Sequence, residues 1–580
     1  AGGTAEALQS DNLGDLKARG LTIPSTVKRI VDVNPSFGGP LAKDRLWFYA
    51  GAREFITDVY VPGLYTNQDV RAWVYRPTTT RAVNDVHDKN VSLNLTFQAT
   101  PKNKFTFFYN YDFECFCHNQ ISALLSAEAA WHENARNRLY QGTWSSPVTN
   151  HLLVEASASR YASEFPRDIQ PASAVGGVAL EPSILEQSNN MRFRSAPSNP
   201  RNDGIIDHYR ASVSYVTAAH ALKIGAEVEN QWADDSDRNV GNVSYRTLQG
   251  IPNQAIYYTY PYHWNSTMIP GAIYVQSQST LRRWTVNAGL RYDFFEGSYP
   301  ASHVDPTQYL PVARNYPGAH VLSWKDSDPR LGVSWDVFGT GKTAVKATVS
   351  RFILQEGKTN TNAIHPVTAA TNSVARTWTP SAAAIARIRA GDPTVAPVGD
   401  PLNPAANGEL GPSPNNNFGK PITTLHYDQG WATGYGTRPF DWEFSGGVQH
   451  EIMPRVSVTA MYYRRIYGNF VVTRNLLVSA ADYDPYCITA PSDSRLPGGG
   501  GQQICGLYDL NPSKVGLVDQ ERSSSAKYGS QYDHWNGVDV TMNARLSNGP
   551  LLQGGFSTGK KMTDNCQLVA KIGNPSLYNC

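Results

Sequence analysis

The sequence has 580 residues, of which 41% are hydrophobic, 11% aromatic and only 17% charged. A soluble protein of this length would need about three or four domains, and no shift in composition marks boundaries between them. The formal net charge of +2 is too small to indicate a nucleic acid or an acidic partner.

Neither a transmembrane helix nor a signal peptide is visible in the sequence. No stretch approaches 18 apolar residues, so a membrane protein with this sequence would have to be a closed β-barrel. Residues 1–22 have neither a basic start nor an apolar stretch. We therefore expect a mature exported chain or a fragment, and the family resemblance described below favours a fragment.

Segments of alternating apolar and polar residues recur along the chain. The clearest is residues 91–98, VSLNLTFQ, followed after a Thr-Pro-Lys-Asn turn by residues 105–113, FTFFYNYDF. A period of two predicts strands with one apolar and one polar face. In this hairpin we expect an outward face of Val91, Leu93, Leu95 and Phe97 and an inward face of Ser92, Asn94, Thr96 and Gln98.

Eight such hairpins are predicted, each with a tight turn at one end. The turns are Pro40–Asp44, Thr100–Asn103, Ser146–Asn150, Thr217–His220, Thr280–Arg282, Gly339–Lys342, Met453–Arg455 and Ser547–Pro550. Long polar stretches separate the hairpins, at about 58–86, 115–136, 162–205, 232–270, 296–329, 354–439 and 467–532. Short and long connections therefore alternate throughout, which is typical of a transmembrane barrel with short periplasmic turns and long extracellular loops.

The six cysteines fall into three local pairs, Cys115/Cys117, Cys487/Cys505 and Cys566/Cys580. Local pairing fits loops closed by disulfides in an oxidising compartment, although the spacing does not settle the connectivity. The first pair lies in Cys115-Phe116-Cys117-His118, which could also hold zinc or copper with at most three ligands. Free thiols are the alternative for Cys487 and Cys505, which bracket a Gly-rich stretch.

Two short motifs suggest chemistry that their context does not support. Gly339-Thr340-Gly341-Lys342-Thr343 resembles part of a P-loop, but Asp336 stands where the first glycine should be, so we expect a tight turn. Ser524-Ser525-Ala526-Lys527 matches the Ser-x-x-Lys pattern of some serine hydrolases without a companion motif. We predict no catalytic, metal or cofactor site, and therefore no enzyme.

Several segments together resemble the Oar-like TonB-dependent receptors. They are residues 36–48 (SFGGPLAKDRLWF), 144–156 (WSSPVTNHLLVEA), 273–276 (IYVQ) with 290–293 (LRYD), 328–332 (DPRLG) with 338–344 (FGTGKTA), and 462–470 (YYRRIYGNF). The resemblance runs from about residue 30 to 580, in the order that the family shows. It implies a 22-stranded outer-membrane barrel that holds a plug domain and imports a nutrient with energy delivered through TonB.

The sequence departs from that family at both ends. No plug or TonB box is visible, and the last residues do not form a strand with a terminal aromatic. We expect an all-β transmembrane antiparallel barrel with about 16 of 22 strands, lacking the plug, and with a gap or a poorly paired edge. Residues 1–29 are assigned to the end of the first barrel region and the first extracellular loop, and residues 30–580 to the barrel.

The first functional hypothesis is energised uptake of a scarce solute, namely a siderophore, a cofactor, a glycan or a peptide. The expected partners are outer-membrane lipid, the TonB complex acting through a plug, and the solute, and the expected location is the outer membrane. Loop aromatics of a suitable type are Trp378, Tyr427, Trp431 and Tyr435, for which loop packing is the alternative. A passive porin, an adhesin on a barrel scaffold and a secreted carbohydrate-binding protein are the competing hypotheses, and the last predicts strands with apolar residues on inward faces only.

Overall fold

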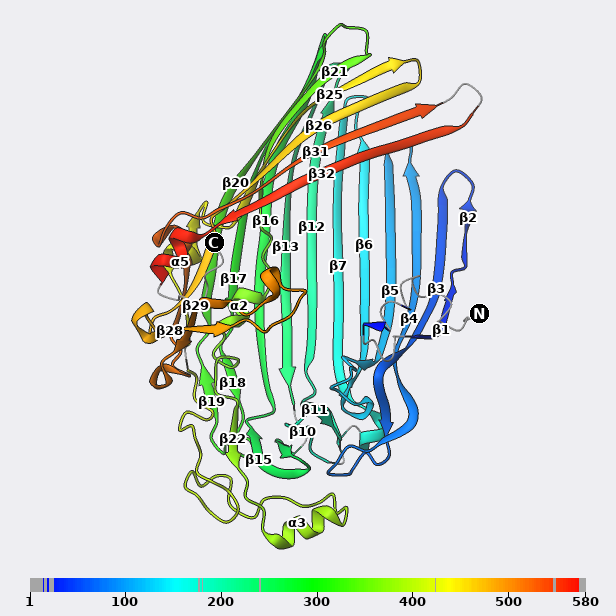
Figure 1. Cartoon of the computed structure of the whole chain (residues 1–580). Helices are drawn as coiled ribbons and strands as arrows, with labels where there is room; N and C mark the ends of the chain where they lie inside the picture. Colours follow the sequence, from blue (N-terminus) through cyan, green and yellow to red (C-terminus); the bar gives the residue numbers. More distant parts are fainter. Residues whose placement is uncertain are drawn as a thin grey trace.

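The chain is all-β, as the sequence predicts, with 64% of residues in strands and 8% in helices. Figure 1 shows the computed structural model, which describes residues 14, 18, 19, 26–175, 178, 179, 181–238, 241–422, 424–545 and 549–572. Among these residues, no helix is long and apolar enough to cross a membrane.

One curved antiparallel sheet of 18 strands dominates the molecule, and we call it the wall (Figure 1). Its strands are β1 (Thr26–Val33), β2 (Ser36–Ala42), β3 (Leu46–Asn67), β4 (Pro77–Thr100), β5 (Asn103–Asn119), β6 (Trp131–Pro147), β7 (Leu152–Ile169), β12 (Arg201–Val216), β13 (His220–Asp237), β16 (Tyr262–Leu281), β17 (Trp284–Tyr299), β20 (Ala319–Asp336), β21 (Thr343–Ile353), β24 (Thr433–Tyr435), β25 (Phe440–Met453), β26 (Val456–Gly468), β31 (Tyr532–Arg545) and β32 (Leu551–Asp564).

The strands of the wall follow one another in chain order. The strands β1 and β2 lie end to end along β3, and the short β24 adds a parallel pairing to β20. Every other wall pairing is antiparallel. Among the described residues, no backbone pairing joins β32 to β1 or β2, so the wall has two unpaired edges. This arrangement fits the expected gap in the wall.

The two faces of the wall differ in the way that the alternating pattern predicts. Val91 and Phe97 are 50% and 40% exposed, and strand register places them on the same face as Tyr111 and Phe105 of β5. On the opposite face, the side chain of Asn90 donates to Asn110 across the same strand pair. The apolar face continues around the wall, for example at Ile273, which is 58% exposed. A single sheet with its apolar face outward contradicts the hypothesis of a secreted protein whose apolar residues face only inward.

All the described tight turns lie at one end of the wall, and the long connections lie at the other (Figure 1). Seven of the eight predicted turns are found where expected, whereas residues 546–548 of the eighth lie outside the described residues. At Gly339 and Gly341 the backbone has φ of 71° and 73°, and the Asp336 carboxylate accepts from both N–H groups. The Gly-Thr-Gly-Lys-Thr motif is therefore a hairpin turn followed by the strand β21.

The connections at 58–86 and 115–136 are shorter than predicted, because the strands extend well beyond the alternating segments. The strand β4 has 24 residues, and only residues 68–76 separate it from β3. Pairing continues through polar residues, as at Asp58 with Asp85. Pairing between two strands satisfies the backbone hydrogen bonds whatever the side chains are. The strands therefore continue into segments that lack hydrophobic alternation, where the sequence gives no sign of them.

The longer connections contain structure of their own. Their strands are β8 (Ala174–Val175), β9 (Val178–Ala179), β10 (Ile184–Glu186), β11 (Met191–Phe193), β14 (Val243–Leu248), β15 (Ile251–Tyr258), β18 (Ser302–Val304), β19 (Arg314–Tyr316), β22 (Ser373–Thr377), β23 (Leu425–Tyr427), β27 (Val471–Asn475), β28 (Tyr483–Thr489), β29 (Gln503–Leu510) and β30 (Gln520–Ser524). Their helices are α2 (Thr359–Ala363), α3 (Ala382–Arg389), α4 (Gln429–Ala432) and α5 (Cys566–Ile572), with short 3₁₀ turns at Ala127–Ala129, Pro171–Ser173, Ala480–Asp482, Pro497–Gly499, Pro512–Lys514 and Ser525–Lys527.

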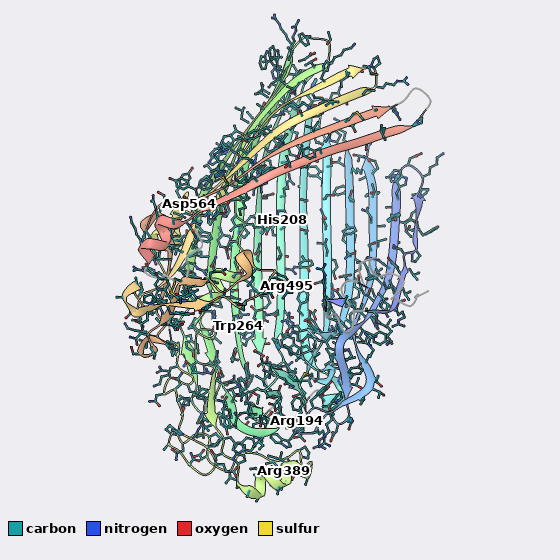
Figure 2. The ribbon with its side chains drawn as sticks, in the orientation of Figure 1. Arg194, His208, Trp264, Arg389, Arg495 and Asp564 are labelled. Atoms are coloured by element: carbon teal, nitrogen blue, oxygen red, sulfur yellow. A yellow bond between two sulfur atoms is a disulfide. The ribbon has the colours of Figure 1, made fainter. Side chains whose placement is uncertain are left out.

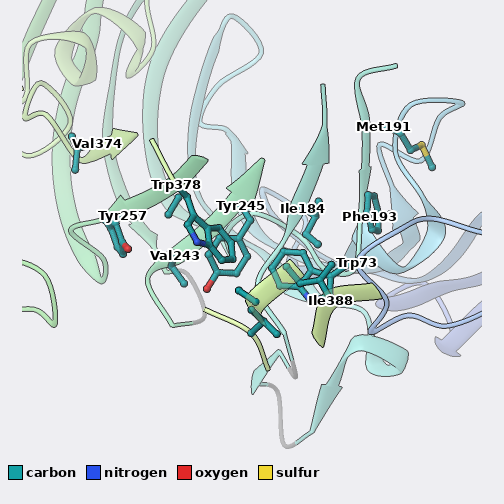
Figure 3. Close-up of a cluster of buried hydrophobic side chains, with 14 of the residues drawn as sticks. Trp73, Ile184, Met191, Phe193, Val243, Tyr245, Tyr257, Val374, Trp378 and Ile388 are labelled. Atoms are coloured by element: carbon teal, nitrogen blue, oxygen red, sulfur yellow. The ribbon is translucent and has the colours of Figure 1, made fainter. Parts of the chain in front are cut away.

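Four connections come together in a folded unit that we call the cap. It consists of the five-stranded sheet β11-β10-β14-β15-β22, the helix α3 and the segment between β3 and β4. Its core contains Trp73, Phe193, Tyr245 and Trp378, as Figure 3 shows. The Trp378 ring lies 5.8 Å from that of Trp73 and 5.2 Å from that of Tyr245. The cap is therefore a hydrophobic core built from loops, which the sequence analysis did not anticipate.

The side chain of Arg376, in β22, also holds the cap together. Its guanidinium is 1% exposed and donates to the backbone carbonyls of Gly411, Asn403 and Ala405 at 2.6–2.9 Å, with further contacts to Pro401 and Asp400. The five N–H groups of an arginine suit such a ring of acceptors. One buried side chain thus fixes the irregular segment 400–411.

A second loop cluster packs on the inner, polar side of the wall. It comprises the three-stranded sheet β23-β30-β27 with α2 and α4. Trp431 of α4 packs edge-to-face against Trp324 of β20, and the Trp324 indole donates to the Trp431 carbonyl at 2.7 Å. Met268 and Phe295 of the wall belong to the same buried cluster. The polar face of the wall therefore becomes apolar near its loop end, where this cluster covers it.

Candidate functional site

The polar face of the wall carries several ion pairs between side chains of neighbouring strands. Arg291 of β17 forms ion pairs with Glu227 at 2.6 Å and with Asp293 at 2.8 Å. Lys223 of β13 pairs with Glu155 of β7 at 2.9 Å. These residues occupy the face opposite the exposed apolar side chains, because successive residues of a strand point to opposite sides. The arrangement is typical of a surface that meets water, a solute or a polar protein domain.

A cavity of about 720 Å³ lies on this polar face between β12 and β21. Its polar lining includes Arg210, Lys223, Glu227, Arg291, Asp328 and Arg330. Arg210 donates to the hydroxyl of Tyr274, and the Arg330 guanidinium lies 4.7 Å from the Phe352 ring centre. Both guanidinium groups are thus held by neutral partners, which leaves part of their charge available to an incoming group.

A second cavity, of about 460 Å³, lies further along the same face between β25, β26 and β31. It is lined by Tyr463, Tyr467 and Trp535 together with Arg465, whose guanidinium pairs with Glu443 and, at 3.2 Å, with Asp441. Aromatic rings beside a satisfied ion pair can hold a flat or sugar-like surface without a net charge.

A smaller cavity, of about 240 Å³, separates the wall from the second loop cluster. Trp324, Trp431, Arg438 and Arg522 are among its lining residues, as is Glu356. Burial raises the pKa of the Glu356 carboxyl above its ordinary value, although hydrogen bonds from Asn360 oppose the shift. A negative charge is therefore disfavoured at this carboxyl relative to its state in water.

Beneath this cavity, two arginines and two aspartates form a buried ionic network. The Arg438 Nε donates to the Asp326 Oδ2 at 2.7 Å, and the Arg351 Nη1 donates to the Asp328 Oδ1 at 2.8 Å. Arg351 also reaches the second carboxylate oxygen of Asp326 at 3.3 Å. Buried charges are tolerated when they are paired and hydrogen-bonded in this way. The network ties the segment before β25 to the inner face of β20.

The four loop aromatics singled out in the sequence have different surroundings. Trp378 is 1% exposed within the cap core. Trp431 is also buried, but it lines the smaller cavity, and Tyr427 packs against it with ring centres 5.0 Å apart. Tyr435 is 65% exposed. Loop packing therefore accounts for Trp378, whereas Trp431 lines a cavity and Tyr427 packs against Trp431.

The structure joins two of the three predicted cysteine pairs. Cys487 and Cys505 form a disulfide with a Cα–Cα distance of 4.2 Å, between β28 and β29. Cys115 and Cys117 form another within β5. Cys580 lies outside the described residues, so its pairing with Cys566 stays a prediction.

The predicted metal alternative at Cys115 and Cys117 has a different histidine from the one suggested by the sequence. His132 of β6 lies beside the two sulfur atoms, with the three potential ligand atoms within 4.8 Å of one another. His118 instead contacts the Asp85 carboxylate at 2.6 Å. The pairing of β5 with β6 brings His132 close, which spacing along the chain cannot show. As a disulfide, the two sulfurs offer no thiolate to a metal.

The lysine of the Ser-x-x-Lys motif is engaged by a residue outside the motif. Ser524 ends β30, and the Lys527 ammonium forms an ion pair with the Asp428 carboxylate. A lysine paired in this way stays protonated and does not serve as a general base.

Sequence reasoning missed Arg438, Arg522 and Glu356. They lie in connections that show no periodic pattern, at positions separated by up to 166 residues along the chain. No local motif marks them, and only the folding of the loops onto β20 brings them together.

Comparison with known proteins gives one family match and several matches in fold. The sequence model of a family described as "Outer membrane beta barrel domain" matches residues 62–578. The outer membrane transporter YddB from Escherichia coli is 11% identical with a TM-score of 0.51, and the match covers 93% of this chain and 55% of that chain. The ferric yersiniabactin uptake receptor FyuA from Yersinia pestis is 8% identical with a TM-score of 0.50, covering 93% and 60%.

At these identities the likeness to the solved structures is one of fold alone. The chain spans between a half and two thirds of the length of the two structures. No curated protein matches the sequence at a significant level.

Proposed function

Because the chain belongs to a family of outer membrane β-barrel domains and is located in the outer membrane, we propose that it is the barrel wall of a TonB-dependent receptor that takes up a scarce solute. The observation that carries the proposal is the combination of an outward apolar face with a polar inner face that bears cavities beneath folded loops. A barrel embedded in lipid needs the first, and selective capture needs the second.

The resemblance to the Oar-like receptors supports a more specific proposal. We propose a complete wall of about 22 strands, in which β32 and the β1–β2 edge pair with further strands, and an Oar-like subgroup within the receptors. A plug would dock on the charged inner face near Arg291 and Lys223, and the TonB complex would act through that plug. The solute is proposed to be a siderophore, a cofactor, a glycan or a peptide.

We also propose that the protein is not an enzyme. Support comes from the surroundings of the one motif that suggested catalysis, since Lys527 is held by Asp428. The cavities offer charges and aromatic rings for binding, and binding suffices for a receptor.

The test is an uptake assay with a panel of labelled ferric siderophores, cobalamin, oligosaccharides and peptides. Cells with and without a working TonB system would express either the full gene or the 580-residue segment. We expect TonB-dependent accumulation of at least one solute with the full gene only. Equal, energy-independent passage through both would instead identify a passive pore and would overturn the receptor proposal.

A further inference from the structure

The 240 Å³ cavity between β20 and the second loop cluster has an unusual excess of hydrogen-bond donors. The Nη2 of Arg438 and the Nε1 of Trp431 are buried and have no hydrogen-bond partner among the described residues. Both residues line the cavity. A buried donor without a partner costs about 1–3 kcal/mol, so a persistent pair of such groups beside a cavity calls for an acceptor.

Arg522 of β30 adds a third donor, and its nearest partners are neutral, although the Glu356 carboxylate lines the same cavity. Its guanidinium donates to the side-chain oxygens of Asn360 and Thr473, which are both neutral. It forms no ion pair with any carboxylate in the described part of the chain. The same guanidinium lies 5.9 Å from the ring centres of both Tyr427 and Trp431, which keep it over the aromatic side of the cavity.

Once the buried ionic network is set aside, Arg522 and Glu356 are the charged groups that remain among the residues lining the cavity. Arg438 is paired with Asp326 through its Nε, and Arg351 is paired with Asp326 and Asp328, so these four groups roughly balance. Glu356 is the remaining acid, and both its carboxylate oxygens accept hydrogen bonds from Asn360. Asn360 in turn accepts from Arg522. The carboxylate of Glu356 is thus already engaged, and Arg522 is oriented by Asn360.

We propose that this cavity is a subsite for a carboxylate carried on a flat apolar group of the solute, with Arg522, the Arg438 Nη2 and the Trp431 Nε1 as its donors. This inference rests on the proposed function as a solute receptor and names the chemistry of one part of the solute. The carboxylate supplies the missing partners of the Arg438 Nη2 and the Trp431 Nε1 and lies beside the charge of Arg522. Charge-assisted hydrogen bonds of this kind are the stronger ones. The rings of Trp324 and Trp431 contact the apolar body.

The size of the cavity limits what it can hold. Drug-sized ligands occupy pockets of about 300–1,000 Å³, so a cavity of about 240 Å³ accommodates one head group and not a complete large solute. Leu354, which is exposed, and Pro439 form an apolar edge through which the rest of the solute would extend.

The experiment is a calorimetric titration of the purified full chain in detergent with benzoate, using benzamide as the neutral probe of the same shape. We expect benzoate to bind at least about tenfold more tightly than benzamide, because a hydrogen bond to a charged group contributes about 1.5–3 kcal/mol. Arg522→Gln and Trp431→Phe should each weaken benzoate binding about tenfold, and Trp431→Phe keeps the aromatic ring. Arg495→Gln, which removes an exposed arginine from the segment between β28 and β29, should leave benzoate binding unchanged (Figure 2).

Glu356→Gln separates the proposal from simple damage to the loops. The substitution keeps an acceptor for Asn360 and removes the negative charge that competes with the ligand, so benzoate should bind about three to ten times more tightly. A protein with disordered loops would lose binding instead of gaining it. Equal affinities for benzoate and benzamide, or unchanged benzoate affinity in Arg522→Gln, overturn the subsite.

The outcome of this titration is independent of the uptake assay, because binding in detergent needs neither a plug nor TonB. A chain that binds benzoate as expected but shows TonB-independent passage in cells keeps the subsite and loses the proposed receptor role. A chain that supports TonB-dependent uptake but does not distinguish benzoate from benzamide keeps the role and loses the subsite.

Discussion

The wall and the cap use similar side chains in opposite ways. In the wall, Ile273 and Leu290 point outward and are about half exposed, so their stabilising environment is lipid. In the cap, Trp73 and Trp378 are almost completely buried against each other, as in a soluble domain. The difference shows that aromatic and aliphatic content alone does not tell which solvent a segment of this chain meets, since the pattern of neighbours decides it.

The largest expected effect is on the cap alone. Arg376→Met should destabilise the cap by about 3–5 kcal/mol. The substitution leaves the buried carbonyls of Gly411, Asn403 and Ala405 without a hydrogen-bond donor. Hydrogen exchange should become fast in residues 373–411 and stay slow in the wall strands. Arg389→Met, an exposed position on α3 in the same cap, is the control (Figure 2). Equal protection of the cap in both variants would contradict the role given to Arg376.

The second prediction concerns the wall and leaves the cap untouched. Ile273→Arg should destabilise the protein in a lipid bilayer by about 2–4 kcal/mol, because the side chain lies on the lipid-facing side. Gln276→Arg, three residues away on the polar face, should change stability by less than about 1 kcal/mol. Denaturant unfolding in vesicles measures both. If the two variants were destabilised equally, the assignment of the faces would be wrong.

The stability of one loop region should depend on pH, whereas that of the wall should not. His365, in the connection between β21 and β25, is fully buried, and burial together with nearby His263 lowers its pKa to about 4. The folded loop therefore keeps a neutral imidazole, whereas an unfolded loop protonates near pH 6.5. The stabilisation is complete above pH 6.5 and is lost as the pH falls towards 4, by up to about 3 kcal/mol.

Proteolysis of the connection between β21 and β25 as a function of pH measures this loss. His365→Gln does not titrate, so its cleavage rate should stay flat between pH 6.5 and 4 while that of the unsubstituted protein rises. Parallel pH profiles for the two proteins would show that another group is responsible. Cleavage of the wall hairpins should not change in either protein.

The wall could be predicted from sequence because its rules are local. Residues 91–98 and 105–113 show their faces through alternation, and the turn at Gly339 and Gly341 follows from glycines that adopt positive φ. The extension of β3 and β4 beyond the alternating segments could not be predicted, since polar pairs such as Asp58 with Asp85 carry no such signal. The disulfide of Cys487 with Cys505 was predictable because the two residues lie close in the chain.

The cap and the smaller cavity could not be predicted, because each depends on contacts between separate connections. Trp378 and Trp431 lie in the same connection, between β21 and β25, yet the first fills a core and the second lines a cavity. Arg438 is held in place by Asp326, which lies on β20, and Arg522 is held by Asn360. Single-sequence patterns describe neighbours along the chain and carry no information on such pairs.

The contact between Trp73 and the segment that follows α3 has a consequence for the order of folding. The Trp73 indole donates to the Asp392 carbonyl, a residue 319 positions later in the chain. Closing so long a separation has a high entropic cost unless the intervening hairpins have already paired. We therefore expect the wall to assemble first and the cap to fold last, so the inserted protein passes through a stage in which the long connections at one end of the wall are not yet packed together.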